Sequence, residues 1–153
     1  MKAESATDVQ AETLYWLIVS LDAFGQALLR NDPQLDRWAH FHNTECKVFG
    51  PRYDPAGWWS ADHGQIGPAE RQAFSRAAKS LETLGLVTLI RRHGSRLSHV
   101  RPTPKGLAVG LRLAPEASRA AIRAAIQTAE WGTSDHLDAL DQAAKARKAK
   151  RHQ

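Results

Sequence analysis

Hydrophobic residues recur every three or four positions along much of this chain, which is the spacing of amphipathic helices. The longest such stretch covers residues 9–30 and ends where residues 31–33 interrupt the pattern. Similar spacing predicts a shorter helix over residues 34–44, an alanine-rich helix over residues 116–129 and a last helix that begins at Ser134. The pattern therefore predicts a mainly helical protein.

The predicted helix over residues 9–30 has a broad hydrophobic stripe, which Tyr15 and Trp16 widen further. A stripe of this width usually packs on more than one neighbour. Two arrangements fit it: burial inside the core of the same chain, or pairing of part of the helix with a second copy. Residues 1–8 are polar and predict a loosely held start, with a helix cap at position 7 or 8.

A further helix is predicted from residue 68 to residue 84. Pro68 suits a first helical position, Glu70 places a negative charge in the first turn, and Gly85 suits the residue after the last turn. One face of this helix is apolar and carries Phe74, Ala77, Ala78, Leu81 and Leu84. The other face has cationic or short hydrogen-bonding side chains, which suit base edges and phosphates in a DNA major groove: Arg71, Gln72, Ser75, Arg76, Lys79 and Thr83.

A basic hairpin is predicted after this helix. Val87 and Leu89 are spaced for one strand, and Leu97 and Val100 for the returning strand. Four arginines flank the flexible tip at residues 93–95: Arg91, Arg92, Arg96 and Arg101. From Arg71 to Lys105 the chain has eight Lys or Arg residues and one acidic residue, for a formal charge of +7, whereas the whole chain carries +5. Positive charge is therefore concentrated here and in the C-terminal tail.

The run SRAAKSLETLGLV, the basic hairpin and the segment VRPTPKG together resemble the winged helix-turn-helix domains of bacterial regulators, including the MarR-like group. In that family the helix that ends in LE-x-x-GLV is the recognition helix, the hairpin is the wing, and a V-x-LT-x-x-G segment ends the return strand. Residues 100–106 match that segment, with Pro102 in place of the usual leucine, and Thr103 and Pro104 suit the start of another helix. The resemblance covers about 40 residues, and it implies a DNA-binding module whose flanking helices form a dimer.

A helix-turn-helix also needs a supporting helix three or four residues before the recognition helix. Either a short helix over residues 56–62 fills this role or a long loop replaces the turn, and we favour the helix. Residues 46–49 are expected to form a short strand, the third strand of the wing sheet. Trp58 and Trp59 are interpreted as core-edge residues, with stacking on bases as the less common alternative.

Composition and charge limit the classes of protein to which this chain can belong. The net charge of +5 and the isoelectric point near 9.7 permit a polyanionic partner. No apolar run approaches the ~20 residues that span a membrane, and the first residues lack a signal sequence, so we expect a cytoplasmic protein without membrane association. Cys46 is the only cysteine, which excludes an intrachain disulfide.

Catalytic and metal-binding patterns are weak. The chain has no glycine-rich phosphate loop, no nucleophile elbow and no evident acid pair, so we expect neither enzymatic activity nor a cofactor. His40, His42, Cys46 and His63 come nearest to a zinc-ligand set, but they lack the paired spacing of zinc motifs. Residues two apart on a helix also diverge. We therefore expect no metal and interpret these histidines as surface or interface residues.

The predicted fold is mainly α with a small β-hairpin wing: a winged helix-turn-helix with flanking N- and C-terminal helices in one domain, residues 1–153. Its expected parts are N-terminal helices for the core and dimer, a winged DNA-binding module, C-terminal helices and a basic tail. These parts are assigned to residues 9–45, 46–110, 111–144 and 145–153.

The predicted function is sequence-specific binding of double-stranded DNA by a homodimer that regulates transcription. Contacts in the major groove are expected from Gln72, Ser75, Arg76 and Lys79. Contacts of the wing with phosphates or the minor groove are expected from Arg91, Arg92, His93 and Arg96, and other backbone contacts from Arg71, Arg101 and Lys105. Two alternatives stay open: a winged-helix module that binds protein, and a DNA-binding role in plasmid or phage replication. The sequence does not identify an operator or a small-molecule effector.

Overall fold

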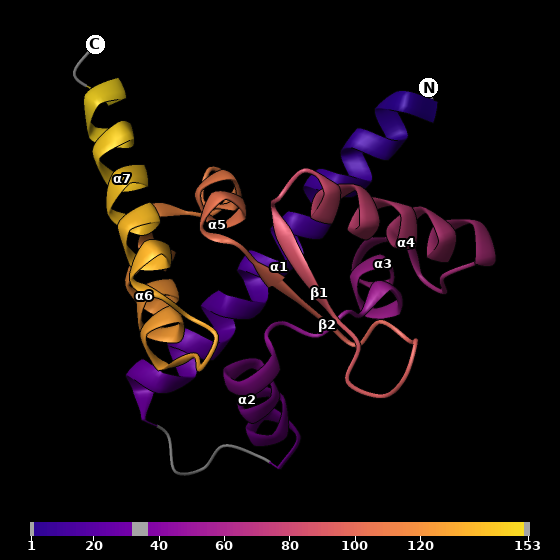
Figure 1. Ribbon diagram of the computed structural model, residues 1–153, viewed down its shortest axis with the longest axis horizontal. Coiled ribbons are helices and arrows are strands. Elements are labelled where there is room, and N and C mark those ends of the chain that lie inside the picture. The colour runs from indigo at the N-terminus through magenta and orange to yellow at the C-terminus, as the bar shows by residue number, and fades with distance from the viewer. Residues whose placement is uncertain (1, 32–36, 152–153) are drawn as a thin grey trace.

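The computed structural model describes residues 2–31 and 37–151, and the side chains of residues 8–31 and 37–146. Over these residues the protein is mainly helical, with one small antiparallel hairpin (Figure 1). The elements in chain order are α1 (Lys2–Arg30), α2 (Arg37–Phe49), α3 (Pro55–His63), α4 (Pro68–Thr83), β1 (Val87–Ile90), β2 (His99–Pro102), α5 (Pro104–Gly110), a 3-10 turn (Glu116–Ser118), α6 (Arg119–Thr128) and α7 (Ser134–Arg151). Within the described ranges, no helix combines the length and apolarity needed to cross a bilayer.

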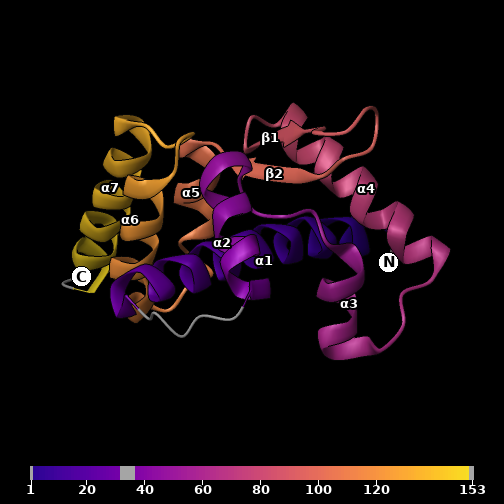
Figure 2. The same ribbon diagram turned by 90° about the horizontal axis from the view of Figure 1, so that it is seen from below.

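Helix α1 runs through the middle of the molecule and contributes to two hydrophobic clusters (Figure 2). Toward its C-terminus, Leu21 and Phe24 are buried in one cluster with residues of α5, α6 and α7. Toward its N-terminus, Leu14 and Leu17 are buried in the other with α3, α4 and the hairpin. The broad stripe of this helix is therefore explained mainly by burial in the chain's own core.

The contact between α1 and α6 is very close. A Cβ atom at Gly25 would lie 1.7 Å from the carbonyl oxygen of Ala121, so only glycine fits at this crossing. Ile122 and Ile126 of α6 are buried beside it. The small residues of α6 thus let the two helices approach until backbone meets backbone.

Helices α3 and α4 are joined by only residues 64–67. The short supporting helix predicted over residues 56–62 is confirmed as α3, and the Asp54 side chain caps it by accepting a hydrogen bond from the Gly57 N–H at 3.2 Å. Helix α4 starts at Pro68 as predicted, and Gly85 follows its end with φ of 76°. Gly85 adopts this left-handed conformation without the steric cost of a Cβ.

Strands β1 and β2 pair with Leu89 opposite Val100, both buried in the cluster under α4. Residues 51–53 lie along the other edge of β2. The Val100 N–H donates to the Pro51 carbonyl at 2.8 Å, and the Tyr53 N–H donates to the Ser98 carbonyl at 2.9 Å. The third strand was predicted over residues 46–49, whereas the residue that bridges to β2 is Arg52, opposite His99.

Helix α5 begins as the sequence predicted. The Thr103 hydroxyl donates to the Gly85 carbonyl at 2.7 Å and accepts from the Gly106 N–H at 3.1 Å, which ties the return strand to the end of α4. A Cβ atom at Gly106 would lie 1.7 Å from the Leu86 carbonyl oxygen. Threonine and glycine at these two positions are thus explained by a cap and by a close backbone approach.

Several predicted boundaries were wrong. Residues 46–49 form the last turn of α2, because that helix continues beyond residue 44, where its predicted range ended. Residues 34–36 of that range lie outside the described residues. Helix α1 begins at Lys2, so no cap separates residues 1–8 from the rest of the helix. The helix predicted over residues 116–129 is split into a 3-10 turn and α6.

Candidate nucleic-acid interface

The cationic face of α4 points away from the core. Phe74, Ala77, Ala78 and Leu81 are buried on the inner face. On the outer face Ser75 is half-buried, and four side chains are exposed: Arg71, Gln72, Arg76 and Lys79. Among the described residues no acidic group lies within ion-pairing distance of Arg71, Arg76 or Lys79. Their charges are therefore available to an external anion.

The tip of the hairpin is also basic and exposed. His93 and Arg96 form an isolated bridge, and Gly94 between them has φ of 82°. Arg91, Arg92, His93 and Arg96 are all exposed. Arg91 and Arg96 have no ion pair within the described part of the chain. The tip thus presents several cations in a short, tightly turned loop.

The two basic features lie at the same end of the molecule. In both views the N-terminal end of α4 and the loop between β1 and β2 are at the end away from α6 and α7 (Figure 1 and Figure 2). Strand β1 contacts α4, and strand β2 contacts α2. The hairpin therefore meets α4 through one strand and α2 through the other.

The side turned toward α2 is anchored by Glu45. Its carboxylate pairs with the Arg92 guanidinium, and its Oε2 lies 3.1 Å from His99 Nε2. The Arg92 guanidinium also lies 4.3 Å from the centroid of the Phe49 ring, a cation–π contact. Ser98 closes the base of the loop, since its hydroxyl accepts from the Arg92 N–H at 3.0 Å. Arg92 is thus held at the base of the hairpin loop, the wing root, whereas Arg91 and Arg96 have no ion pair among the described residues.

Burial of the His99 ring lowers its pKa below the ordinary value of 6.5, and the nearby Glu45 carboxylate opposes this effect without cancelling it. At neutral pH the His99 ring is therefore uncharged. The Glu45 carboxylate therefore has one charged partner, the Arg92 guanidinium, and one neutral partner, the His99 ring.

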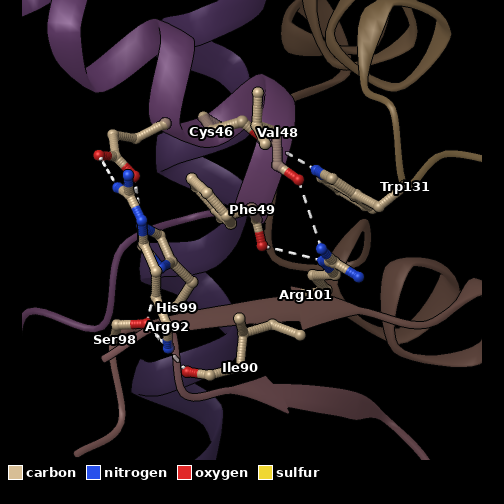
Figure 3. Close-up of polar contacts among 10 residues, drawn as sticks. Cys46, Val48, Phe49, Ile90, Arg92, Ser98, His99, Arg101 and Trp131 are labelled. Atoms are coloured by element: carbon tan, nitrogen blue, oxygen red, sulfur yellow. Dashed lines mark hydrogen bonds and ion pairs between the residues drawn. The ribbon is translucent and has the colours of Figure 1, made fainter. Parts of the chain in front are cut away.

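Arg101 was predicted to contact the DNA backbone, but the structure gives its side chain a different role (Figure 3). Its Nε donates to the Phe49 carbonyl at 2.9 Å, and a terminal nitrogen donates to the Val48 carbonyl at 3.3 Å. We therefore remove Arg101 from the set of candidate DNA contacts. It binds the carbonyl end of α2, where a cation also interacts favourably with the helix dipole.

Other segments of the chain donate hydrogen bonds to further carbonyl groups in the last turn of α2. Trp131 Nε1 donates to the Cys46 carbonyl at 2.8 Å, and the Glu130 N–H donates to the Lys47 carbonyl at 2.9 Å. The last carbonyl groups of a helix have no partner within the helix itself. Here β2 and the loop after α6 supply the partners, so α2 is fastened to both halves of the molecule.

Lys105 is exposed at the start of α5, where its Nζ donates to the Leu84 carbonyl at 3.2 Å. This hydrogen bond places its charge at the C-terminal end of α4. Lys105 therefore lies at the opposite end of α4 from Arg71.

The histidines and the cysteine weighed as metal ligands are dispersed. His40 is exposed, His42 packs edge-on against Trp38, and His63 stacks on Trp59. Burial raises the pKa of the Cys46 thiol to about 12, which disfavours the thiolate that a metal requires. Over the described ranges no three His, Cys, Asp or Glu residues cluster as a metal site would. Trp58 is buried in the core, as the sequence indicated.

Sequence reasoning missed the residues that surround the wing root. Glu45 and Phe49 come from α2, and Arg52 bridges to His99 from the segment after it. Glu45 and Arg92 are 47 positions apart, so no local pattern links them.

The predicted basic tail begins inside α7, which continues to Arg151. Lys145 is exposed there. The side chains of Arg147, Lys148, Lys150 and Arg151 lie outside those described. The backbone thus extends the helix into the stretch that was expected to be a frayed end.

Comparison of the chain with models of protein families, with curated proteins and with solved structures gives no match.

Proposed function

We propose that this protein is a winged helix-turn-helix protein that binds double-stranded DNA in a sequence-specific manner. The observation that carries the proposal is the pairing of two unneutralised basic features at one end of the molecule, the outer face of α4 and the tip of the hairpin. The order of elements supports it, since α3, a connection of residues 64–67, α4 and a hairpin follow one another.

In this arrangement α4 is the recognition helix. Gln72, Ser75, Arg76 and Lys79 face the major groove, where Gln and Arg side chains can pair with adenine and guanine. Arg71 contacts a phosphate at the N-terminal end of the helix. Arg91 at the tip supplies a further phosphate or minor-groove contact, and Arg92 orients the wing through Glu45.

The protein acts as a homodimer in this proposal, and its role is the regulation of transcription. Leu28 and Leu29 at the end of α1 are 37% and 57% exposed, and such residues are commonly covered by a partner. A two-fold dimer places two copies of α4 on successive turns of one face of the duplex. A palindromic target sequence follows from this symmetry.

The test is DNA binding by a variant with Arg76→Ala and Lys79→Ala. We expect a loss of about 1–3 kcal/mol per residue that reads a base, and a salt-dependence slope smaller by up to about 2 if both residues touch phosphates. The matched control is Arg112→Ala with Lys145→Ala, which removes the same charge from exposed positions outside α4 and the wing.

Fluorescence anisotropy with a duplex selected from random fragments measures both variants. Equal affinity in the α4 variant and the control would overturn the proposal, because the effect would then be one of net charge alone. Absence of duplex binding by the unmodified protein at low salt would also overturn it.

A further inference from the structure

A groove of about 750 Å³ separates α2 from the hairpin. We call it the α2–wing groove. One wall comes from α2, the floor from the segment after it, and the other wall from the hairpin loop. The lining of the groove includes Trp38, Phe41, Arg52, Arg92, His93 and Arg96.

The α2 wall presents flat aromatic rings to solvent. Trp38 is 71% exposed and Phe41 57%, although large apolar side chains in a monomer are ordinarily covered. The two residues are three positions apart on a helix and so share one face. His42 packs edge-on against both rings, with its ring centroid 3.9 Å from that of Trp38 and 5.5 Å from that of Phe41.

The floor and the opposite wall are cationic. Arg52 and Arg96 are exposed, and within the described residues neither has an acidic partner. Glu45 is the one acidic residue among those that line the groove, and it is already paired with Arg92 and His99. The charge facing the groove is therefore positive and uncompensated.

An aromatic wall opposite a cationic wall matches a ligand with flat faces on one side and repeated negative charges on the other. We propose that the α2–wing groove binds an unpaired DNA strand, with bases stacked on Trp38 and Phe41 and phosphates held by Arg52 and Arg96. Base–aromatic stacking together with a basic path for the backbone is the general chemistry of single-strand binding. A duplex does not fit this mode, because its bases are already stacked on one another.

Binding of an unpaired strand is separate from duplex binding and depends only on the residues that line the groove. The residues that line the groove come from α2, the segment after it and the hairpin, and none comes from α4. A molecule with both sites holds a duplex on α4 and an unpaired strand in the groove. Partly opened DNA is then a better ligand than a closed duplex.

The experiment measures binding of the whole protein to an oligothymidine of about ten nucleotides, by anisotropy at low salt. An abasic deoxyribose-phosphate strand of the same length has the same charge but no bases. We expect it to bind about tenfold more weakly than oligothymidine. In a Trp38→Ala, Phe41→Ala variant the affinity for oligothymidine should fall to that of the abasic strand.

The matched control is Tyr15→Ala with Leu113→Ala, which removes two other side chains that are each 42% exposed and should leave oligothymidine binding unchanged. Thermal unfolding verifies that each variant is folded. The Arg76→Ala, Lys79→Ala variant separates the two proposals, since it should lower duplex binding and leave oligothymidine binding within about twofold.

Three outcomes would overturn the assignment. The first is equal binding of the abasic strand and oligothymidine, which would show that charge alone attracts the ligand. The second is tighter binding of oligouridine than of oligothymidine, which would assign the groove to RNA. The third is binding of a polyglutamate peptide as tight as that of oligothymidine and equally dependent on Trp38, which would indicate an acidic protein partner.

Discussion

Arg101 shows how one side chain can serve the fold while resembling a DNA contact in sequence. Its guanidinium donates to two carbonyl groups at the end of α2, from a position on β2. Gly50 makes room for it, since a Cβ atom there would lie 2.7 Å from Arg101 Cγ, and its φ of 106° disfavours any other residue. The planar fork of arginine offers two nitrogens in a fixed geometry to the two carbonyls, whereas a lysine has a single ammonium nitrogen.

Replacing Arg101 with alanine should therefore destabilise the protein. We expect the free energy of unfolding to fall by about 2 kcal/mol, because two hydrogen bonds from a charged donor are lost and two helix carbonyls lose their partner. Arg101→Lys should lose less. Denaturant unfolding measures the change.

The control for that experiment is Arg96→Ala, which removes an exposed arginine that has no ion pair among the described residues. Its effect on stability should stay within about 0.5 kcal/mol. If Arg101→Ala behaves like Arg96→Ala, the assignment of Arg101 to the fold is incorrect, and a phosphate contact becomes the better explanation.

At the scale of elements, the wing is fixed in place by a contact between a helix and a hairpin. Glu45 of α2 binds both Arg92 and His99, which flank the hairpin loop. His99 is 6% exposed and takes part in the bridge to Arg52. The orientation of the wing therefore depends on a polar cluster in which one member, His99, has a pKa below the ordinary value of 6.5.

Acid should weaken the folded state through His99. Because burial lowers its pKa in the folded protein, the unfolded chain binds the proton more readily at pH values between that pKa and the ordinary value of 6.5. Stability should thus fall as the pH drops below 6.5. The neutral variant His99→Gln should lose less stability than the unmodified protein between about pH 7.5 and about pH 5.5.

Thermal unfolding of both proteins at the two pH values gives this comparison. Other groups that titrate in the same window, including His42, whose pKa burial also lowers, are common to both proteins and cancel in the difference. An equal loss of stability in the two proteins would contradict the prediction, as would a larger loss in His99→Gln.

Local sequence predicted the elements around this cluster better than their contacts. Helix α4 and the hairpin follow from apolar spacing, from Pro68 and Gly85 at the helix ends, and from the Thr103 cap. Residues 46–49 were misassigned as a strand, because a short apolar run has no period of its own. Their helical state depends on Arg101 and Trp131, which satisfy their carbonyls from distant segments.

At the scale of the whole molecule, α1 joins the end that carries α4 and the wing to the end formed by α5, α6 and α7. At the second end, the close crossing at Gly25 brings the backbones of α1 and α6 into direct contact. Leu28 and Leu29 lie one turn beyond that crossing and remain partly exposed. This is the surface on which the proposed homodimer depends.

Sedimentation equilibrium tests the dimer directly. We expect a mass of twice 16.9 kDa for the unmodified chain, and a shift toward 16.9 kDa for Leu29→Glu, since a buried unpaired charge is costly in an interface. Lys47→Glu, at an exposed position on α2, is the control for the introduced charge. A chain that stays at 16.9 kDa at high concentration would rule out the dimer.

The sequence by itself determined where most of the helices lie, where the basic hairpin lies and how charge is distributed along the chain. These properties depend on residues a few positions apart, through periodicity, caps and turns. Tertiary structure alone decided which cations are free. Arg101 and Phe49 are 52 positions apart, and Arg92 and Glu45 are 47 apart, whereas Arg76 and Lys79 have no acidic partner among the described residues. An arginine looks the same in sequence whether its partner is a carbonyl brought near by folding or an anion outside the protein.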